Sequence, residues 1–194
     1  MPDTSIYLHI PFCKHRCAYC DFNTYAGQEA MIPAYVDALI QEIEFIGKRQ
    51  PDFNVPTIFF GGGTPSLLSG PQFDSVMSAL SSAFNLSPNA EVTIEANPGT
   101  ISPKKLEAIR KAGINRISFG VQSSNTEELR MLERSHDFFT VIEAVSTARK
   151  AGFDNLNLDL IYALPEQTLE SWQTTVKRVL ELQPEHISAY ALTL

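Results

Sequence analysis

Three cysteines lie within eight residues near the start of the sequence, at Cys13, Cys17 and Cys20, and the chain contains no other cysteine. Thiolate sulfur binds zinc and iron–sulfur clusters, and both kinds of centre are normally completed by four protein ligands. Lys14 and Arg16 stand between the first two cysteines, where positive charge favours the metal-binding thiolate form. Three thiolates leave one coordination position open, so the loop predicts a metal centre at which a reactant can bind.

Two kinds of metal centre fit this loop. A structural zinc ion would take His9 or His15 as its fourth ligand, but zinc knuckles usually combine a C-x2-C pair with a second two-ligand element some distance away. The sequence has no second element of this kind, so it favours an iron–sulfur cluster. An odd number of thiols crowded into one loop also favours a reducing compartment.

The composition excludes several classes of protein. The formal charge is -7 at pH 7, so the chain lacks the positive surface that binding to nucleic acid requires. No apolar run approaches the roughly 20 residues that cross a bilayer, and the first residues lack the basic-then-apolar layout of a secretory signal. We therefore expect a globular, cytoplasmic protein without a nucleic-acid partner or a transmembrane segment.

Short apolar segments alternate with helical patterns along the whole chain. Strands are predicted at 5–10, 57–60, 92–95, 116–121, 156–161 and 186–191, with helical segments at 32–46, 71–80, 102–111, 126–150 (interrupted near Ser135) and 169–182. The tetrapeptide Arg-Lys-Ala-Gly occurs at 110–113 and at 149–152, where a basic pair and a glycine predict the end of a helix. This alternation predicts an α/β protein with a parallel sheet in one domain, 1–194. An open doubly wound sheet and a partial TIM-type (β/α)6 barrel both fit the pattern.

Polar residues follow the predicted strands, at the sheet edge where parallel α/β proteins bind ligands. In chain order they are the three cysteines, Gly61 to Gly63 with Thr64, Glu95, Gln122 and, late in the fifth strand, Asp159. Structural alternatives are a tight turn for the glycines, a solvent-facing carboxylate for Asp159 and a solvated helix position for Arg134. No Ser-His-Asp set or carboxylate pair stands out, so no catalytic side chain is predicted.

The spacing C-x3-C-x2-C resembles the cysteine signature of radical S-adenosylmethionine (SAM) enzymes. The resemblance implies a [4Fe–4S] cluster held by Cys13, Cys17 and Cys20, in a loop at about 12–27. SAM would bind the remaining iron, and its reductive cleavage would give methionine and a 5′-deoxyadenosyl radical. The fold implied is a partial (β/α)6 barrel with parallel strands.

A closer resemblance lies in four segments, Tyr-Leu-His-Ile-Pro-Phe-Cys at 7–13, Gly-Gly-Gly-Thr-Pro-Ser at 61–66, Ile-Glu-Ala-Asn-Pro at 94–98 and Arg-Ile-Ser-Phe-Gly-Val-Gln-Ser at 116–123. Together they resemble the oxygen-independent coproporphyrinogen III oxidase family and its heme-chaperone branch, HemW. The resemblance implies that SAM is bound by Tyr7, Tyr19, Gly62, Gly63, Thr64, Glu95, Gln122, Arg134 and Asp159. The glycines would meet the methionyl amino group, and Tyr19 would lie near adenine. Glu95, Gln122, Arg134 and Asp159 would hold the nucleoside and carboxylate portions.

Two departures favour the heme-chaperone branch, whose members bind heme and transfer it to an acceptor protein. Phe22 stands where the oxidase carries a fourth cysteine, and the first strand begins by residue 5, whereas the oxidase has a preceding segment that helps to enclose its substrate. Anaerobic oxidative decarboxylation of coproporphyrinogen III is the alternative function, and a purely structural cluster is another.

Relatives in this branch continue beyond their sixth strand into a C-terminal region with a His-Asn-x-x-Tyr-Trp heme motif. The present sequence has no such motif. We therefore expect a truncated chain that is a core domain without that region. Heme or porphyrin is the expected partner, but heme binding is expected only in a longer chain and is traced to no residue of this sequence. The sequence identifies neither the heme acceptor nor the electron donor.

Overall fold

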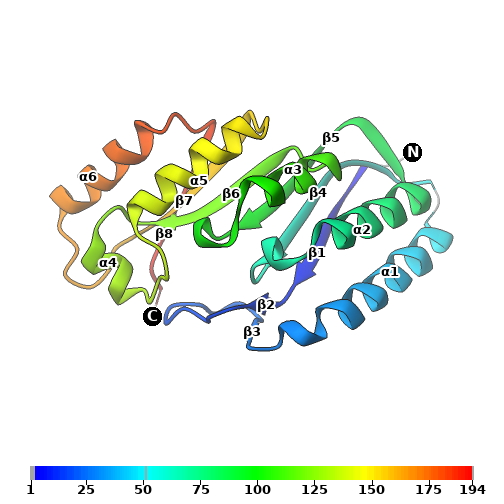
Figure 1. Cartoon of the computed structure of the whole chain (residues 1–194), viewed down its shortest axis with the longest axis horizontal. Helices are drawn as coiled ribbons and strands as arrows, with labels where there is room; N and C mark the ends of the chain where they lie inside the picture. Colours follow the sequence, from blue (N-terminus) through cyan, green and yellow to red (C-terminus); the bar gives the residue numbers. More distant parts are fainter. Residues whose placement is uncertain (1–2, 51, 194) are drawn as a thin grey trace.

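The computed structural model describes residues 3–50 and 52–193 (Figure 1). Residues 1–2, 51 and 194, which include both ends of the expected domain, lie outside this described part. The main sheet consists of six parallel strands, β1 (Asp3–Ile10), β4 (Asn54–Gly62), β5 (Asn85–Ala96), β6 (Arg116–Gln122), β7 (Asn155–Tyr162) and β8 (His186–Ala191). Their spatial order is their order along the chain. A doubly wound sheet requires this order to reverse. The structure therefore confirms the partial (β/α)6 barrel and excludes the doubly wound alternative.

Helices connect successive strands of the sheet. They are α1 (Ile32–Arg49), α2 (Gly70–Ala83), α3 (Pro103–Lys111), α4 (Thr126–Met131), α5 (Phe138–Lys150) and α6 (Leu169–Leu180). The side chains of Ser102, Asn125, Asp137 and Thr168 accept backbone N–H groups at the starts of α3, α4, α5 and α6. The predicted interruption near Ser135 is confirmed, because Asp137 begins a new helix there.

The two Arg-Lys-Ala-Gly segments end α3 and α5, as predicted. Gly113 and Gly152 have φ values of +100° and +85°. Glycine adopts this left-handed region without the steric cost that other residues meet there. Each glycine therefore provides the turn that ends a helix and leads the chain into the next strand.

The sheet has one apolar and one polar face. Side chains such as Leu8, Ile94 and Leu158 are buried in a single core with the inward faces of the helices. Because successive side chains on a strand point to opposite sides, the intervening residues lie on the other face. These are largely polar, and Glu95 and Asp159 are among them. The helices thus cover one face of the half-barrel and leave the polar face available for a ligand.

Several short elements of the structure are not predicted by the sequence pattern. β2 (Phe12–Cys13) and β3 (Tyr25–Ala26) form a separate parallel pair, and 3-10 turns occur at Glu29–Met31, Pro65–Leu67 and Pro98–Thr100. Strands of two residues show no alternation that a pattern could detect. Among the residues that the structure describes, no helix is both long and apolar enough to cross a membrane.

Candidate functional site

The cysteine loop, residues 11–26, is a folded element between β1 and α1. The β2–β3 pair closes its base, where Cys13 lies opposite Ala26. At its tip, the Cys20 amide donates a hydrogen bond to the Cys17 carbonyl at 3.0 Å and closes a tight turn. Figure 1 shows the loop reaching toward α4 and the end of β8. The loop therefore lies at the carboxyl ends of the strands.

Each cysteine sulfur has a hydrogen-bonding neighbour. The pairs are Thr64 Oγ1 donating to Cys13 Sγ at 3.6 Å, Arg134 Nη1 donating to Cys17 Sγ at 3.4 Å, and Thr24 Oγ1 lying 3.9 Å from Cys20 Sγ. The pKa of the Cys13 thiol is raised, mainly by burial, and the hydrogen bond from Thr64 opposes this rise. Hydrogen bonds donated to sulfur stabilise the thiolate form. These hydrogen bonds therefore suit sulfurs in the thiolate form, which is the form that binds a metal.

The two histidines required by the zinc alternative have other partners. His9 Nε2 is 2.9 Å from the Asn23 carbonyl oxygen, and His15 Nε2 is 3.4 Å from a carboxylate oxygen of Glu133. Within residues 3–50 and 52–193, no three His, Cys, Asp or Glu side chains, the three cysteines included, group closely enough to hold a single metal ion.

The predicted glycine segment forms the end of β4 and is fixed against β1. The Gly63 amide donates to the Ile10 carbonyl at 2.8 Å, and the Gly62 amide donates to Glu95 Oε2 at 2.9 Å. Gly62 has a φ of +111°, and a Cβ added there would lie 2.6 Å from the His9 ring. The glycines therefore form the tight turn of the structural alternative, and they also let this turn approach Glu95 closely.

Glu95 is a partly buried carboxyl group near the carboxyl end of β5. Burial raises its pKa to about 7; the Gly62 amide opposes this rise, and the nearby carboxylate of Asp159 adds to it. An ionised Glu95 is therefore costly in the protein alone. A ligand that brings positive charge or hydrogen-bond donors would offset this cost.

The parent protein is expected to lose stability as the pH rises from 5 to 8, and the Glu95→Gln variant is expected not to show this decline. The folded-state pKa is about 7 and the ordinary value is 4.5, so the folded protein holds the proton more strongly. This tighter proton binding stabilises the folded state fully below pH 4.5, and the stabilisation is lost as the pH rises through 7. The free energy of unfolding falls by about 3 kcal/mol in total. Urea unfolding at several pH values should show this decline in the parent and a flatter profile in Glu95→Gln. The exposed control Glu107→Gln should keep the parent profile, and a Glu95→Gln profile as steep as the parent's would contradict the assignment.

Asp159 is held by two side chains that the sequence analysis did not single out. Ser118 Oγ donates to Asp159 Oδ2 and Asn157 Nδ2 donates to Oδ1, both at 2.7 Å. Asp159 is therefore not the freely solvated carboxylate of the structural alternative. Both partners lie at alternate positions of strands with otherwise apolar sequence, which is the signal that could have identified them.

Gln122 ends β6 in an uncommon conformation. Its φ is +69°, and the register of β6 against β7 shifts between Gly120 and Gln122. A Cβ added to Gly120 would lie 2.9 Å from Gln122 Nε2 and 3.2 Å from Arg134 Nη2. Because Gly120 has no side chain, Gln122 and Arg134 can both pack against this position.

Arg134 and Tyr19 contact each other at the edge of the cysteine loop. Arg134 Nη1 donates to Tyr19 Oη at 3.3 Å. The Tyr19 ring packs on a small buried cluster of Leu132, Ile161 and Leu164. Burial raises the pKa of Tyr19 to about 12, with Cys17 and Cys20 nearby and Arg134 opposing the rise. Arg134 is therefore in contact with the loop and is not the solvated helix residue of the alternative.

Tyr7 completes the predicted set from β1. Its ring stacks on Phe59, with 5.9 Å between the ring centroids, and its hydroxyl lies 3.4 Å from His9 Nδ1. Partial burial and the neighbouring Glu95 raise its pKa. The predicted residues thus come from β1, the cysteine loop and the carboxyl ends of β4 to β7, together with Arg134 after α4.

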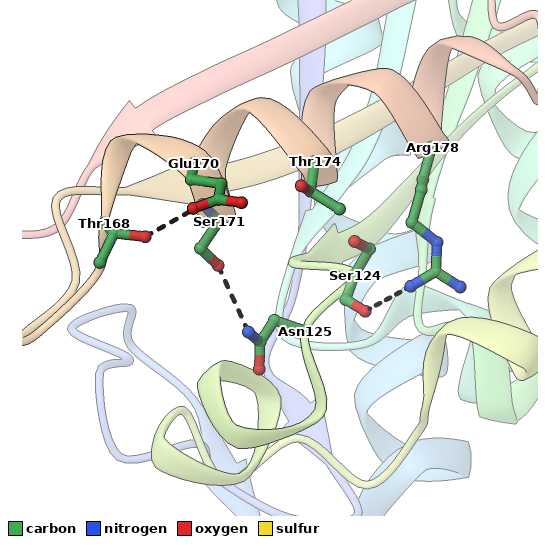
Figure 2. A pocket seen from close by; sticks show the side chains of 7 residues that line it. All are labelled: Ser124, Asn125, Thr168, Glu170, Ser171, Thr174 and Arg178. Carbon is green, nitrogen blue, oxygen red and sulfur yellow. Dashed lines mark hydrogen bonds between the residues drawn. The ribbon is translucent and has the colours of Figure 1, made fainter.

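A separate cleft of about 330 Å³ lies between the segment after β6 and helix α6 (Figure 2). Its lining includes Ser124, Asn125, Ser171 and Arg178, and no residue of the predicted site. Arg178 Nη1 donates to the Ser124 carbonyl at 3.0 Å, and Asn125 Nδ2 donates to Ser171 Oγ at 3.3 Å. These bonds tie α6 to the segment that follows Gln122.

The fold and the cysteine loop together define a class of protein. The chain matches the family model of the Radical SAM superfamily over residues 7–179. It therefore belongs to the radical SAM superfamily, as the cysteine spacing predicts.

The similarity extends to particular members. The chain is 40% identical over 195 residues to the heme chaperone HemW of Escherichia coli, covering 100% of this chain and 52% of that protein. It is 42% identical over 191 residues to HemW of Bacillus subtilis, covering 97% and 50%. The solved structure of the E. coli coproporphyrinogen III oxidase HemN, described as a radical SAM enzyme, matches with a TM-score of 0.91 and 37% identity. This match covers 99% of the present chain and 44% of HemN. The chain thus spans about half the length of these relatives.

Proposed function

We propose that the chain is the SAM-binding core of a HemW-type heme chaperone. The observation that carries this proposal is the cysteine loop, whose sulfurs accept hydrogen bonds from residues beside the polar carboxyl ends of the strands. Identity of about 40% to heme chaperones supports the particular branch. We propose heme binding and heme transfer as functions of the protein, and we assign neither to residues of this chain.

Cys13, Cys17 and Cys20 would hold a [4Fe–4S] cluster. The hydrogen bonds from Thr64 and Arg134 would orient the sulfurs of the first two and support their negative charge. When bound, such a cluster supplies single electrons at low potential and one iron for SAM. The protein side chains then hold SAM and keep water from the iron.

The remaining predicted residues would bind different parts of SAM. Glu95, beside the glycine turn, offers a carboxylate near the place proposed for the methionyl amino group. Asp159, already oriented by Ser118 and Asn157, would accept hydrogen bonds from ribose hydroxyls. The buried Nε of Arg134 has no hydrogen-bonding partner among the described residues and would serve the methionyl carboxylate. Tyr7, Tyr19, Gly62, Gly63, Thr64 and Gln122 would line the same site.

Loading the chain with iron and sulfide under anaerobic conditions is the first test. The proposal expects about four irons and four sulfides per chain, as four-iron clusters require. SAM added to the reduced protein should change the electron paramagnetic resonance (EPR) spectrum, because SAM would coordinate the cluster. A full cluster whose spectrum ignores SAM would support the purely structural alternative instead.

Asp159→Ala is expected to weaken SAM binding by about tenfold to a hundredfold, since a hydrogen bond to a charged group contributes about 1.5–3 kcal/mol. Asp159→Asn keeps the size of the side chain and should also bind weakly. The exposed Asp154→Ala, which precedes β7, is the matched control. Equilibrium titration of the reconstituted chain measures all three. Parent-like affinity in Asp159→Ala would remove the nucleoside role of this residue.

Anaerobic coproporphyrinogen III oxidation is the alternative function, and the 37% identity to HemN keeps it open. Phe22 favours the chaperone, because it provides an exposed ring where the oxidase would have its fourth cysteine. Incubation of the reconstituted protein with coproporphyrinogen III and SAM should leave the substrate unchanged. Incubation with heme should yield a complex that passes heme to an apoprotein. Formation of protoporphyrinogen would select the oxidase.

A further inference from the structure

The guanidinium group of Arg134 joins three parts of the molecule. Nη1 donates to Cys17 Sγ at 3.4 Å and to Tyr19 Oη at 3.3 Å, so one arm holds the cysteine loop. Nη2 donates to the Gly120 carbonyl at 2.8 Å, so the other arm is fixed to β6. The planar fork of arginine suits this arrangement, because its donors point in two fixed directions.

The backbone before Arg134 is shaped to place this side chain. Helix α4 ends at Met131. Glu133, two residues later, has a φ of +53°, and the Arg134 amide donates back to the Leu129 carbonyl at 2.9 Å. This turn is the usual left-handed end of a helix, with glutamate at the position that glycine normally takes. At this turn the chain leaves the helix axis, and the Arg134 side chain lies against the cysteine loop.

A second contact between the same segments is weaker. His15 lies 3.4 Å from Glu133, but the two side chains are 55% and 53% exposed. Exposed ion pairs of this kind contribute little to stability. The partly buried bonds from Arg134 to Cys17 and Tyr19 are therefore the main polar links between the loop tip and the segment after α4.

We propose that Arg134 fixes the cysteine loop against β6 and, through its hydrogen bond to Cys17, makes a cluster on that loop easier to reduce. The inference rests on the proposed [4Fe–4S] cluster. One electron from an external low-potential reductant makes the cluster and its thiolates more negative. The positive group beside the Cys17 sulfur stabilises this reduced form more than the oxidised one, and hydrogen bonds to sulfur are known to set cluster potentials.

A redox titration of the reconstituted chain without SAM tests this role. At a fixed potential, Arg134→Gln should lower the ratio of reduced to oxidised cluster about tenfold, which is 59 mV for a one-electron couple. Arg134→Lys, which keeps the charge, should shift it less. The control Arg130→Gln removes an exposed arginine of α4 that pairs with Glu127 and should titrate like the parent.

The results separate the two proposals. A parent chain that does not take up about four irons contradicts the proposed cluster. A fully loaded Arg134→Gln that titrates like the parent overturns the role of Arg134, as does an equal shift in Arg130→Gln.

Limited trypsin digestion of the metal-free chain provides a test that needs no cluster. Lys14 and Arg16 are exposed in the loop, and their peptide bonds should be cut about tenfold faster in Arg134→Gln when the loop loses its anchor. Arg130→Gln should be cut at the parent rate. Circular dichroism checks that the variants are folded. A folded Arg134→Gln chain with parent-like cleavage at these two sites overturns the proposal even where the variant fails to load iron.

Discussion

Replacement of Cys17 by alanine is expected to abolish assembly of the intact four-iron cluster. The chain has three cysteines and no fourth thiol that could take the vacated position. Removing Cys17 also leaves Arg134 Nη1 without its sulfur acceptor in the loop. We expect fewer than half of the parent's irons after anaerobic reconstitution, together with loss of the broad visible absorption that iron–sulfur clusters give. Iron and sulfide analysis on desalted protein measures the effect.

Phe22→Ala is the matched control for this prediction. Phe22 lies two residues after the third cysteine and is 66% exposed, so its removal should disturb neither the sulfurs nor the core. The control should retain the full parental iron content. A Cys17→Ala chain with about four irons and four sulfides would show that Cys17 is not a ligand.

Gly62→Ala is expected to lower the free energy of unfolding by about 3 kcal/mol, because two costs add. A residue with a side chain at a φ of +111° is strained, at about 1–3 kcal/mol. The new methyl group would also lie 2.6 Å from the His9 ring, and such overpacking costs about 1–3 kcal/mol. Urea unfolding measures the loss.

Gly152→Ala separates the two costs. Gly152 also has a positive φ, +85°, but an added Cβ there meets no atom within 4 Å. This control should therefore lose only about 1–2 kcal/mol through strain. In a His9→Ala background, Gly62→Ala should cost less than in the parent, since the ring that it meets is gone. Equal losses in Gly62→Ala and Gly152→Ala would contradict the steric account.

The main elements of the fold were predictable because each has a local signal. The strands alternate or are wholly apolar, and glycine at 113 and 152 marks helix ends through its left-handed conformation. The choice between a doubly wound sheet and a half-barrel has no local signal, because it depends on the order in which strands pair. The pair β2–β3 is too short for any pattern to indicate.

The site was predictable to a different degree for different residues. The three cysteines have a diagnostic spacing. Glu95 lies next to the end of β5 and Asp159 in the second half of β7, each between apolar neighbours. The contact from Ser118 depends on the register between β6 and β7, which the sequence of either strand does not specify, whereas Asn157 lies two residues before Asp159 on the same strand. Arg134 lies against the loop because Glu133 takes a left-handed conformation that pattern rules assign to glycine.

The hydrogen bonds to the cysteine sulfurs also join segments that are far apart in the sequence. The cysteines are neighbours in sequence, but Thr64 is 51 residues from Cys13, and Arg134 is 117 residues from Cys17. Contacts between such distant segments are slow to form, because closing a long loop costs entropy before the contact is made. A nascent chain that has exposed only its first residues to solvent therefore has the thiols without their supporting donors. If insertion of the proposed cluster requires these donors, it follows the assembly of β4 and β6, and a loaded loop then reports that this part of the sheet has folded.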